Sequence, residues 1–468
     1  MKNERFSFCL IFLKNQYFHI ISFAHSLKNQ FYHQKSNSFK KSTDFCILLF
    51  RNPKFFSEER SVVCKMNAHK VAKRNLFIMW FANFFIGGSM TMVLPFISLY
   101  IGTFGDYSTQ YIQHWSGWTF GITFVTAFLF SPIWGRIGDR YGRKKILIAC
   151  AFGMGLSIFL MGFVENVWQL FVLRMFTGIF TGFISMSQAF ISTQTPKEIA
   201  GRVLGTLQTG NITGSLFGPL LGGILADTLG YSTAFKFTSI TIFISGLLVF
   251  ATKEYQMERQ KGTKSSYTSR EVLSHILRNP ILVNVMLIST LVQVAHFSIQ
   301  PILSLYVGEL HGTSNLGFYS GIAFSAAGLG NLLMARHWGK IGDRHGHVKI
   351  LVLLLFLTAL VYLPGAFINH FWQLVFVRFI LGMAIGGIIP VRIAYIRQEA
   401  PVTMQGEVLG YNTSLRFLGN IIGPAMGGMV AGFYGFSAVF ITTSTLLLIA
   451  GLVLYFAMHR NPELARSH

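Results

Sequence analysis

Long apolar stretches alternate with short polar segments from Leu76 almost to the end of the chain. Each stretch has about 20 residues, the length that a helix needs to cross the hydrocarbon core of a bilayer. Backbone amides in lipid must be paired within their own segment, so the stretches are interpreted as helices. We therefore predict an all-α membrane protein with twelve transmembrane helices. The expected spans are 76–101, 112–134, 146–164, 168–193, 201–226, 233–252, 281–307, 315–338, 349–367, 372–396, 405–433 and 437–458.

The overall composition agrees with membrane insertion rather than a soluble fold. Hydrophobic residues make up 52% of the chain and charged residues 12%, whereas soluble domains carry roughly 25% charged residues. A formal net charge of +22 can indicate nucleic-acid binding, but the positive residues lie between apolar stretches and at the chain ends. This distribution is typical of cytoplasmic loops that face anionic lipid, so we expect no nucleic-acid partner.

Lys and Arg are concentrated in alternate connections between the expected spans. They follow the second and eighth spans and fill the segment between the sixth and seventh: Arg136, Arg140, Arg143, Lys144, Lys145, Lys253, Arg259, Lys261, Lys264, Arg270, Arg278, Lys340, Arg344 and Lys349. The opposite connections contain Asp106, Glu165, Asp227 and Glu309 and no Lys or Arg. Because this bias sets topology, both termini and the central linker are predicted to be cytoplasmic.

The first 65 residues differ from the rest of the chain. They contain no apolar stretch long enough to span a bilayer, and the cysteines of the chain show no spacing typical of a metal site. We interpret residues 1–65 as an extension from a misplaced start, with Met66 as the functional start; a disordered cytoplasmic tail is the alternative. A six-helix bundle at 66–252, a cytoplasmic linker at 253–279, a second bundle at 280–460 and a tail at 461–468 complete the expected domains.

The sequence contains an internal duplication. Residues 134–142, WGRIGDRYG, recur as WGKIGDRHG at 338–346, which is 204 residues later. Further blocks recur in the same order with nearly the same spacing: Pro95 as Pro301, Trp168 as Trp372, Arg174 as Arg378, and Gly218-Pro219 as Gly423-Pro424. Two parallel repeats predict two pseudo-symmetric six-helix bundles, with a substrate site between them near the bilayer midplane.

The repeated segment at 134–142 opens a motif of glycines and charges between the second and third spans. Its members are Gly135, Asp139, Arg140, Gly142, Arg143 and Lys144, and the second copy retains Gly339, Asp343 and Arg344. We expect Gly135 and Gly142 to permit tight turns, and Asp139 to accept hydrogen bonds from Arg143 and a helix N-terminus. Such a cluster can hold the two halves together on the cytoplasmic side. The alternative is a loop whose charges only set the orientation.

Small residues recur every four positions on one face of the fifth span. They are Gly214, Gly218 and Gly222, with Pro219 and Gly223 beside them. This spacing lets helix backbones approach closely, and proline bends a helix. We expect a tightly packed seam between the halves that resists ion leak; simple packing is the alternative.

Polar side chains recur at helical spacing in several spans. The candidate cavity residues are Asn83, Gln188, Gln208, Asn211, Gln293, Gln300, Arg392, Asn412 and Arg416. Polar groups avoid lipid, so we expect these stripes to line a central substrate cavity; hydrogen bonding between helices is the alternative for each residue. No carboxylate lies in the middle of a span, and His296 is the candidate group for carrying a proton.

These motifs resemble those of the major facilitator superfamily. The segment from Gly135 to Lys144 is similar to the signature between helices two and three of that family, and the copy at Gly339 is a weaker version. The segment from Gly214 to Gly223 resembles the motif of its twelve-helix drug:proton antiporters. Arg174 with Gly178 resembles an intramembrane arginine motif that the family links to proton transfer.

The resemblance covers the chain from about Met66 to its end and implies a specific function. It implies a multidrug efflux pump of the fluoroquinolone-resistance type in the bacterial inner membrane, which exchanges lipophilic drugs for protons. We expect a monomer without cofactor or metal. A transporter of one metabolite is the alternative, because Arg392 and Arg416 could bind an organic anion. An intramembrane enzyme is disfavoured, because neither HExxH nor GxSxG occurs.

Overall fold

The computed structural model describes residues 53–195, 197–254, 269–401 and 404–460 of the chain. Within these ranges, the side chains of residues 53–70, 139, 197–198, 200–202, 269 and 406 are not described. The chain forms two compact units, Met1–Lys70 and Val71–His468, and the second contains the helices discussed below from Val71 onward. The expected extension at 1–65 is described only from Pro53, and the expected tail at 461–468 lies outside the described residues.

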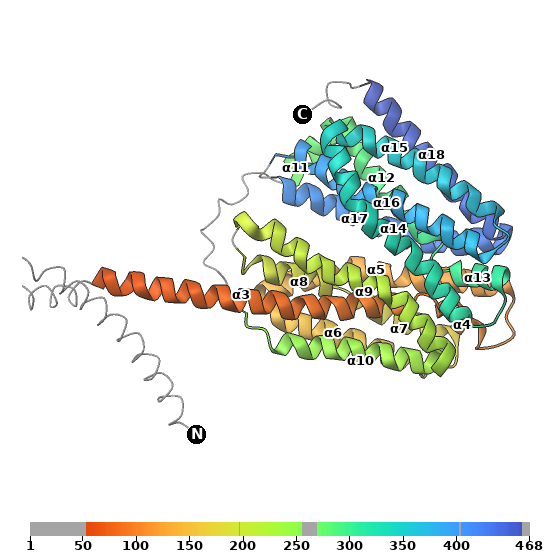
Figure 1. The fold of residues 1–468 in the computed structure, drawn as a ribbon, viewed down its shortest axis with the longest axis horizontal. Helices are drawn as coiled ribbons and strands as arrows, with labels where there is room; N and C mark the ends of the chain where they lie inside the picture. The colour runs from red at the N-terminus through yellow and green to blue at the C-terminus, as the bar shows by residue number, and fades with distance from the viewer. Residues whose placement is uncertain (1–52, 196, 255–268, 402–403, 461–468) are drawn as a thin grey trace, which may run out of the picture. The chain divides into compact units, whose positions relative to one another are not determined.

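The first half of the second unit is a bundle of long helices joined by short connections (Figure 1). Its helices are α3 (Pro53–Met92), α4 (Ile97–Gly102), α5 (Thr109–Tyr141), α6 (Arg143–Met161), α7 (Val167–Ile179), α8 (Phe183–Ser192), α9 (Lys197–Leu229) and α10 (Tyr231–Phe250). Glu254 is the last described residue before a gap in the linker, and α11 (Ser269–Arg278) occupies the described end of that linker. The linker therefore contains a helix that the polar sequence did not predict.

The second half repeats this arrangement and is drawn in green to blue in Figure 1. Its helices are α12 (Pro280–Ser298), α13 (Leu303–His311), α14 (Leu316–His345), α15 (His347–Tyr362) with a 3₁₀ turn (Leu363–Phe367), α16 (Phe371–Glu399), α17 (Gln405–Tyr434) and α18 (Phe436–Arg460). In the described chain, eleven segments are long and apolar enough to cross a membrane. The remaining expected span, 76–101, is divided between α3 and α4, which completes the twelve-helix architecture.

Prolines explain why two expected spans are broken. The first span is interrupted by a turn at 93–96 that contains Pro95, and the seventh by a turn at 299–302 that contains Pro301. Proline lacks an amide donor and its ring clashes with the preceding turn, so a helix bends or ends there. The fourth span also divides, between α7 and α8, whereas its repeat partner α16 is continuous.

Corresponding side chains make corresponding hydrogen bonds in the two halves. The Tyr100 hydroxyl donates to the carbonyls of Met161 and Val164, and the Tyr306 hydroxyl donates to those of Gly365 and Ile368. The indole N–H of Trp134 donates to the carbonyl of Ile179, as that of Trp338 does to Met383. These matches confirm that the duplicated sequence folds as two pseudo-symmetric bundles.

Two helix pairs join the halves. Helix α9 of the first half packs against α14 of the second, and α5 packs against α17. The helices α6 and α10 pair within the first half, as α15 and α18 do within the second. We call the end of the bundle where α5 meets α6 and α14 meets α15 the basic end. The opposite end, where α9 finishes and α14 begins, is the acidic end.

The glycine face of α9 packs within its own half rather than between the halves. A Cβ atom at Gly214, Gly218 or Gly222 would overlap backbone or side-chain atoms of α3 between Phe84 and Met92. The expectation that these three glycines form the seam between the halves is therefore wrong. The second half repeats the arrangement, since Gly419, Gly423 and Gly427 of α17 pack against α12. Only glycine allows such close backbone contact, which maximises van der Waals packing between helices in lipid.

Gly222→Leu tests the importance of this contact. The new side chain would overlap the carbonyl oxygen of Met92, and we expect the unfolding free energy to fall by about 1–3 kcal/mol, as for other overpacked sites. Gly205→Leu on the same helix is the matched control, because a Cβ built there has no described atom within 4 Å apart from its chain neighbours and the adjacent backbone of its own helix. Thermal unfolding of the two purified variants would measure the difference. Equal stability of the variants would contradict the packing role.

Candidate functional site

A carboxylate from the linker caps the helix that follows the glycine-rich motif. Helix α5 ends at Gly142, whose φ of 97° lies in the region that glycine favours, and α6 begins at Arg143. The backbone amides of Arg143 and Lys144 donate to the two carboxylate oxygens of Glu254, at 2.7 and 3.1 Å. An anion at this position satisfies unpaired amides and complements the positive end of the helix dipole.

Glu254 was not predicted from the sequence, because it lies more than a hundred positions from the motif. The capping role was expected of Asp139, whose side chain lies outside the described part of the structure. The expected turn at Gly135 is wrong, because α5 continues through this residue to Tyr141. Gly339 is likewise inside α14, which continues to His345. The turn therefore depends on Gly142 and on its repeat partner Gly346, both of which have positive φ.

The two basic side chains after Gly142 bind helix C-termini of the first half. An Nη atom of Arg143 donates to the carbonyl of Ala189 in α8 at 2.7 Å. The Lys144 ammonium donates to the carbonyls of Phe250 and Thr252 at the end of α10, at 2.8 and 2.6 Å. Cations at these positions satisfy terminal carbonyls and complement the negative ends of the helix dipoles. These contacts tie α6, α8 and α10 together within one half.

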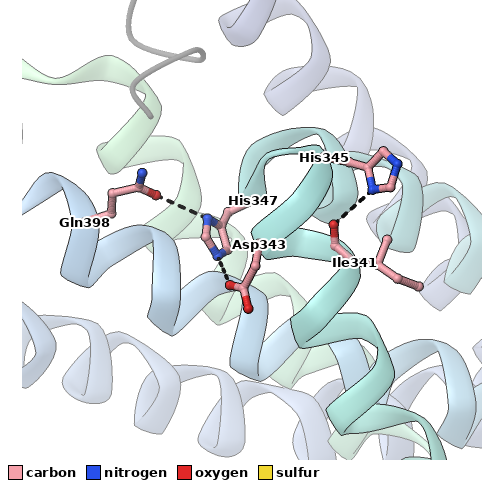
Figure 2. Close-up of polar contacts among 5 residues, drawn as sticks. All are labelled: Ile341, Asp343, His345, His347 and Gln398. Atoms are coloured by element: carbon pink, nitrogen blue, oxygen red, sulfur yellow. Dashed lines mark hydrogen bonds and ion pairs between the residues drawn. The ribbon is translucent and has the colours of Figure 1, made fainter.

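In the second copy of the motif, a histidine lies between an aspartate and a glutamine, as Figure 2 shows. The Nε2 atom of His347 lies 3.1 Å from Oδ1 of Asp343, and its Nδ1 atom lies 3.1 Å from Oε1 of Gln398 in α16. His347 occupies the position of Arg143 in the repeat and likewise reaches the fourth long segment of its own half. Asp343 is 70% exposed, so this cluster is solvated. Arg344 is exposed, as is Arg140, whose guanidinium lies 5.2 Å from the Tyr141 ring.

The contacts that join the halves gather at the acidic end. Both carboxylate oxygens of Asp227, near the end of α9, accept hydrogen bonds from the backbone amides of Gly317 and Phe318, at 2.9 and 2.7 Å. Asp227 thus caps the N-terminus of α14 from the other half. The Ser325 hydroxyl donates to the carbonyl of Leu216 at 2.9 Å. Asp227 was predicted only as an outer charge, because sequence spacing does not show which helix start it faces.

Close backbone contacts also join the halves, at equivalent positions of the α9–α14 and α5–α17 seams. A Cβ atom at Gly321 of α14 would lie 2.6 Å from the carbonyl oxygen of Pro219, and one at Gly223 would overlap Gly317. In the repeat-related seam, a Cβ atom at Gly117 of α5 would overlap the carbonyl oxygen of Pro424. Pro219 and Gly223 therefore do lie between the halves, as expected. Gly214, Gly218 and Gly222 do not lie between the halves, because they pack against α3 of their own half.

Several candidate cavity residues of the first half are paired with one another. The Gln188 amide donates to Oε1 of Gln208 at 2.9 Å, which joins α8 to α9. Oδ1 of Asn83 accepts a hydrogen bond from the Ser187 hydroxyl at 2.9 Å. The Oδ1 atom of Asn211 is buried and has no hydrogen-bond partner. The alternative of bonding between helices thus holds for Asn83, Gln188 and Gln208, and Asn211 retains an unused acceptor.

The second half has a similar polar stripe between α12 and α17. The Gln293 amide donates to Oδ1 of Asn420 at 2.8 Å, and the Ser289 hydroxyl donates to Oδ1 of Asn412 at 2.6 Å. The amide nitrogen of Gln300 lies 3.5 Å from Nε2 of His296, and the Oε1 atom of Gln300 is buried without a partner. Gln293, Asn412 and Gln300 are each less than a tenth exposed. These residues therefore lie in the protein interior rather than in lipid.

Four arginines lie inside the helical bundle without a described carboxylate partner. Arg174 is 6% exposed, its guanidinium lies 5.5 Å from the Phe120 ring, and its Nε atom has no hydrogen-bond partner. Arg378, its repeat partner, is 2% exposed and donates to the carbonyl of Ala323 in α14 at 3.3 Å. Arg392 and Arg416 belong to the second half and both have buried nitrogens without hydrogen-bond partners. The charge of the interior is therefore positive over the described residues.

Two apolar grooves lie at the seams between the halves. The larger has a volume of 650 Å³ and is lined by residues of α9, α14 and α16: Leu216, Phe217, Leu220, Ile322, Ser325, Ala326, Leu329, Trp372, Val375, Phe376 and Phe379. The smaller, of 360 Å³, is lined by repeat-related positions of α17, α5 and α7, including Ile421 and Ile422 in place of Leu216 and Phe217. Neither lining includes a candidate cavity residue. Trp372 is 66% exposed and Phe376 63%, so this part of the larger groove faces outward.

Comparison with known sequences identifies one family. The family model described as Major Facilitator Superfamily matches residues 79–337 and 317–467. The "Uncharacterized MFS-type transporter YuxJ" of Bacillus subtilis (strain 168) is 52% identical over 378 residues, which are 81% of this chain and 96% of that protein. The "Multidrug resistance protein MdtG" of Dickeya zeae (strain Ech586) is 41% identical over 392 residues, which are 83% of this chain and 95% of that protein.

Solved structures share the same fold at low sequence identity. A bacterial homolog of the human lysosomal transporter Spinster, in an inward-facing and occupied conformation, superposes with a TM-score of 0.69 and 13% identity over 85% of this chain and 98% of that chain. A D-xylose-proton symporter superposes with a TM-score of 0.68 and 14% identity over 82% of this chain and 97% of that chain. At these identities the likeness concerns the fold alone, and it agrees with the expected twelve-helix architecture.

Glu254→Ala tests the carboxylate cap at the basic end. The change removes the acceptor for the backbone amides of Arg143 and Lys144, and we expect the unfolding free energy to fall by about 0.5–2 kcal/mol, as for other lost caps. Thermal unfolding of the purified protein would measure this, with Glu165→Ala, an exposed carboxylate at the acidic end, as the matched control. If Glu254→Ala were as stable as this control, the cap would make no significant contribution.

Proposed function

The chain belongs to the major facilitator superfamily, and we propose that it exports lipophilic drugs in exchange for protons. The protein is a multi-pass membrane transporter and not an enzyme. Relatives that carry the name multidrug resistance protein are about as long as this chain from Val71 onward, and one is 41% identical. This similarity supports the choice of drugs as substrates.

The observation that carries the proposed mechanism is the uneven distribution of contacts between the halves. At the acidic end, Asp227 joins the halves by hydrogen bonds to the backbone amides of Gly317 and Phe318, and Ser325 joins them nearer the middle of α9. At the basic end, the contacts of Arg143, Lys144 and His347 described above stay within one half. We infer a conformation that is closed at the acidic end and able to admit substrate from the basic end. Rocking of the two halves about the seams would then reverse the access.

The orientation proposed for this cycle follows from the basic residues. Because Lys and Arg concentrate on the cytoplasmic side of membrane proteins, we place the basic end and both termini in the cytoplasm of a bacterial cell. Substrate would enter from the cytoplasm or the inner leaflet and leave at the acidic end. We propose that the motif residues at the basic end, including Asp139, Arg143 and Asp343, hold helices within each half as the halves rock.

Proton coupling requires a group that changes its protonation during this cycle. Among the described side chains, the carboxylates lie at helix ends or in connections rather than in the middle of a span. We therefore keep His296 as the proposed proton carrier, with Arg174 as the fixed positive charge of the first half. The energy suffices, since one elementary charge moved across 100 mV supplies about 2.3 kcal/mol.

A second candidate function is transport of one defined organic anion. It is favoured by a specific observation, the buried and unpartnered nitrogens of Arg392 and Arg416. Both candidates use the same fold and the same motion, so substrate profiling distinguishes them. A broad set of transported drugs supports multidrug export, and a single transported metabolite supports this alternative.

Transport by everted membrane vesicles tests the proposal. Vesicles from cells that express the chain are energised to an acidic interior, and the accumulation of a fluoroquinolone is followed by fluorescence. We expect accumulation that a protonophore abolishes and that vesicles without the protein do not show. Accumulation that is insensitive to collapse of the proton gradient would contradict proton exchange. Transport of one metabolite and of no drug would contradict multidrug export.

A further inference from the structure

Arg392 is a buried cation without a hydrogen-bond partner. Its side chain is 0% exposed, and its Nε, Nη1 and Nη2 atoms have no hydrogen-bond partner in the part of the chain that the structure describes. Guanidinium remains charged under all physiological conditions and offers five donors in a planar fork. Arg392 lies about 10 Å along α16 from the helix end at Glu399, given the rise of about 1.5 Å per residue. This is too deep for its charge to be solvated like that of a surface residue.

A second arginine lies on the neighbouring helix. Arg416 belongs to α17, which packs against α16, and its Nε atom is buried without a partner among the described residues. Arg416 lies between Asn412 and Asn420 on one stripe of α17. The two asparagines are bonded to α12 through Ser289 and Gln293. The stripe is therefore held in place on both sides of Arg416.

A third arginine of the second half is also buried. Arg378 of α16 is 2% exposed and donates to the carbonyl of Ala323 in α14. Arg378, Arg392 and Arg416 form no ion pair within the described residues. Two like charges in a weakly polar interior repel each other, and each loses its hydration. The free-energy cost of burying these charges is high unless an anion with good hydrogen-bond geometry occupies the site.

We propose that Arg392 and Arg416 form a binding site for the anionic oxygens of an amphiphilic acid, and that such acids are the preferred substrates. A carboxylate or phosphonate offers two or more coplanar or tetrahedral oxygens, which suit the planar fork of a guanidinium. This inference rests on the proposed export function and narrows its substrate class.

The positive charge of Arg392 and Arg416 disfavours lipophilic cations as substrates. A lipophilic monocation such as ethidium would enter a site where two guanidinium groups already repel each other, and no described carboxylate lies beside them. A zwitterion or acid brings the missing negative charge with it. The structure thus predicts a preference by charge among compounds of similar size and hydrophobicity.

A fluoroquinolone and its methyl ester form a matched pair for the test. Norfloxacin carries a carboxylate, and the ester has nearly the same shape without that negative charge. The full-length protein is purified and reconstituted into phosphatidylcholine vesicles for uptake under a proton gradient, and its melting temperature is measured in detergent with each compound. The variants are Arg392→Gln, Arg416→Gln and the charge-conserving Arg392→Lys. Arg460→Gln, an exposed arginine at the end of α18, is the matched control.

We expect the protein to transport norfloxacin faster than its ester and to be stabilised by norfloxacin alone. Arg392→Gln and Arg416→Gln should each reduce norfloxacin transport and affinity roughly 10- to 100-fold, the effect of losing a hydrogen bond to a charged group. Transport of the ester should not change. Arg392→Lys should retain part of the binding, and Arg460→Gln should match the unaltered protein. A melting temperature without compound that equals that of the control separates lost binding from lost folding.

Three outcomes would overturn the inference. Equal transport and equal stabilisation by norfloxacin and the ester would show that the negative charge is not recognised. Unchanged norfloxacin binding by Arg392→Gln would place the anion elsewhere. Stabilisation by phosphatidylglycerol but not by norfloxacin, if lost in Arg392→Gln, would assign the site to a lipid headgroup. If no drug at all is transported while norfloxacin still stabilises the protein through Arg392, the export function fails and the anion site remains.

Discussion

Close backbone contact between helices at the acidic end is the constraint on which the rest of the structure depends. The carbonyl of Pro219 meets Gly321 there, and the carbonyl of Pro424 meets Gly117 in the repeat-related seam. Because these contacts pack backbone against backbone, the two halves can approach at this end without interdigitated side chains. Asp227 adds a directional contact by capping α14 from the other half. The interior polar groups and arginines are then enclosed at one end.

The sequence predicted the parts of this architecture that depend on hydrophobic length and on repetition. Twelve spans and two equivalent halves follow from these two features, and the structure agrees with both. The helix ends were less predictable, because the hydrophobic stretch at 112–134 is shorter than α5, which continues through Gly135 to Tyr141. Polar residues at a helix end leave the bilayer without ending the helix. The expected turn at Gly135 was wrong for this reason.

The functional site was predictable as a set of residues but not as a set of partners. Helical spacing identified Gln208, Gln293 and Asn412 as interior polar groups, and Gln188 was added to them as a polar residue of the fourth span. Helical spacing could not show that Gln188 pairs with Gln208, or that Glu254 caps α6, because these pairs are set by tertiary packing. The glycine face of α9 illustrates the same limit, since spacing predicts close packing but not whether the neighbouring helix belongs to the same half. The charge balance of the interior was visible in the sequence, and the structure adds that Arg392 has no hydrogen-bond partner among the described residues.

Distances between spin labels test most directly whether the halves rock about the acidic end. Labels at Leu229 and Phe367 report on the acidic end and labels at Tyr141 and His345 on the basic end, all at exposed positions. Pulsed electron paramagnetic resonance measures these distances in the reconstituted protein with Asp227 intact, in Asp227→Ala, and in Asp106→Ala as a control. We expect Asp227→Ala, unlike the control, to shift the population toward longer distances at the acidic end and shorter distances at the basic end. Distance distributions that do not change at either end in Asp227→Ala would contradict this expectation.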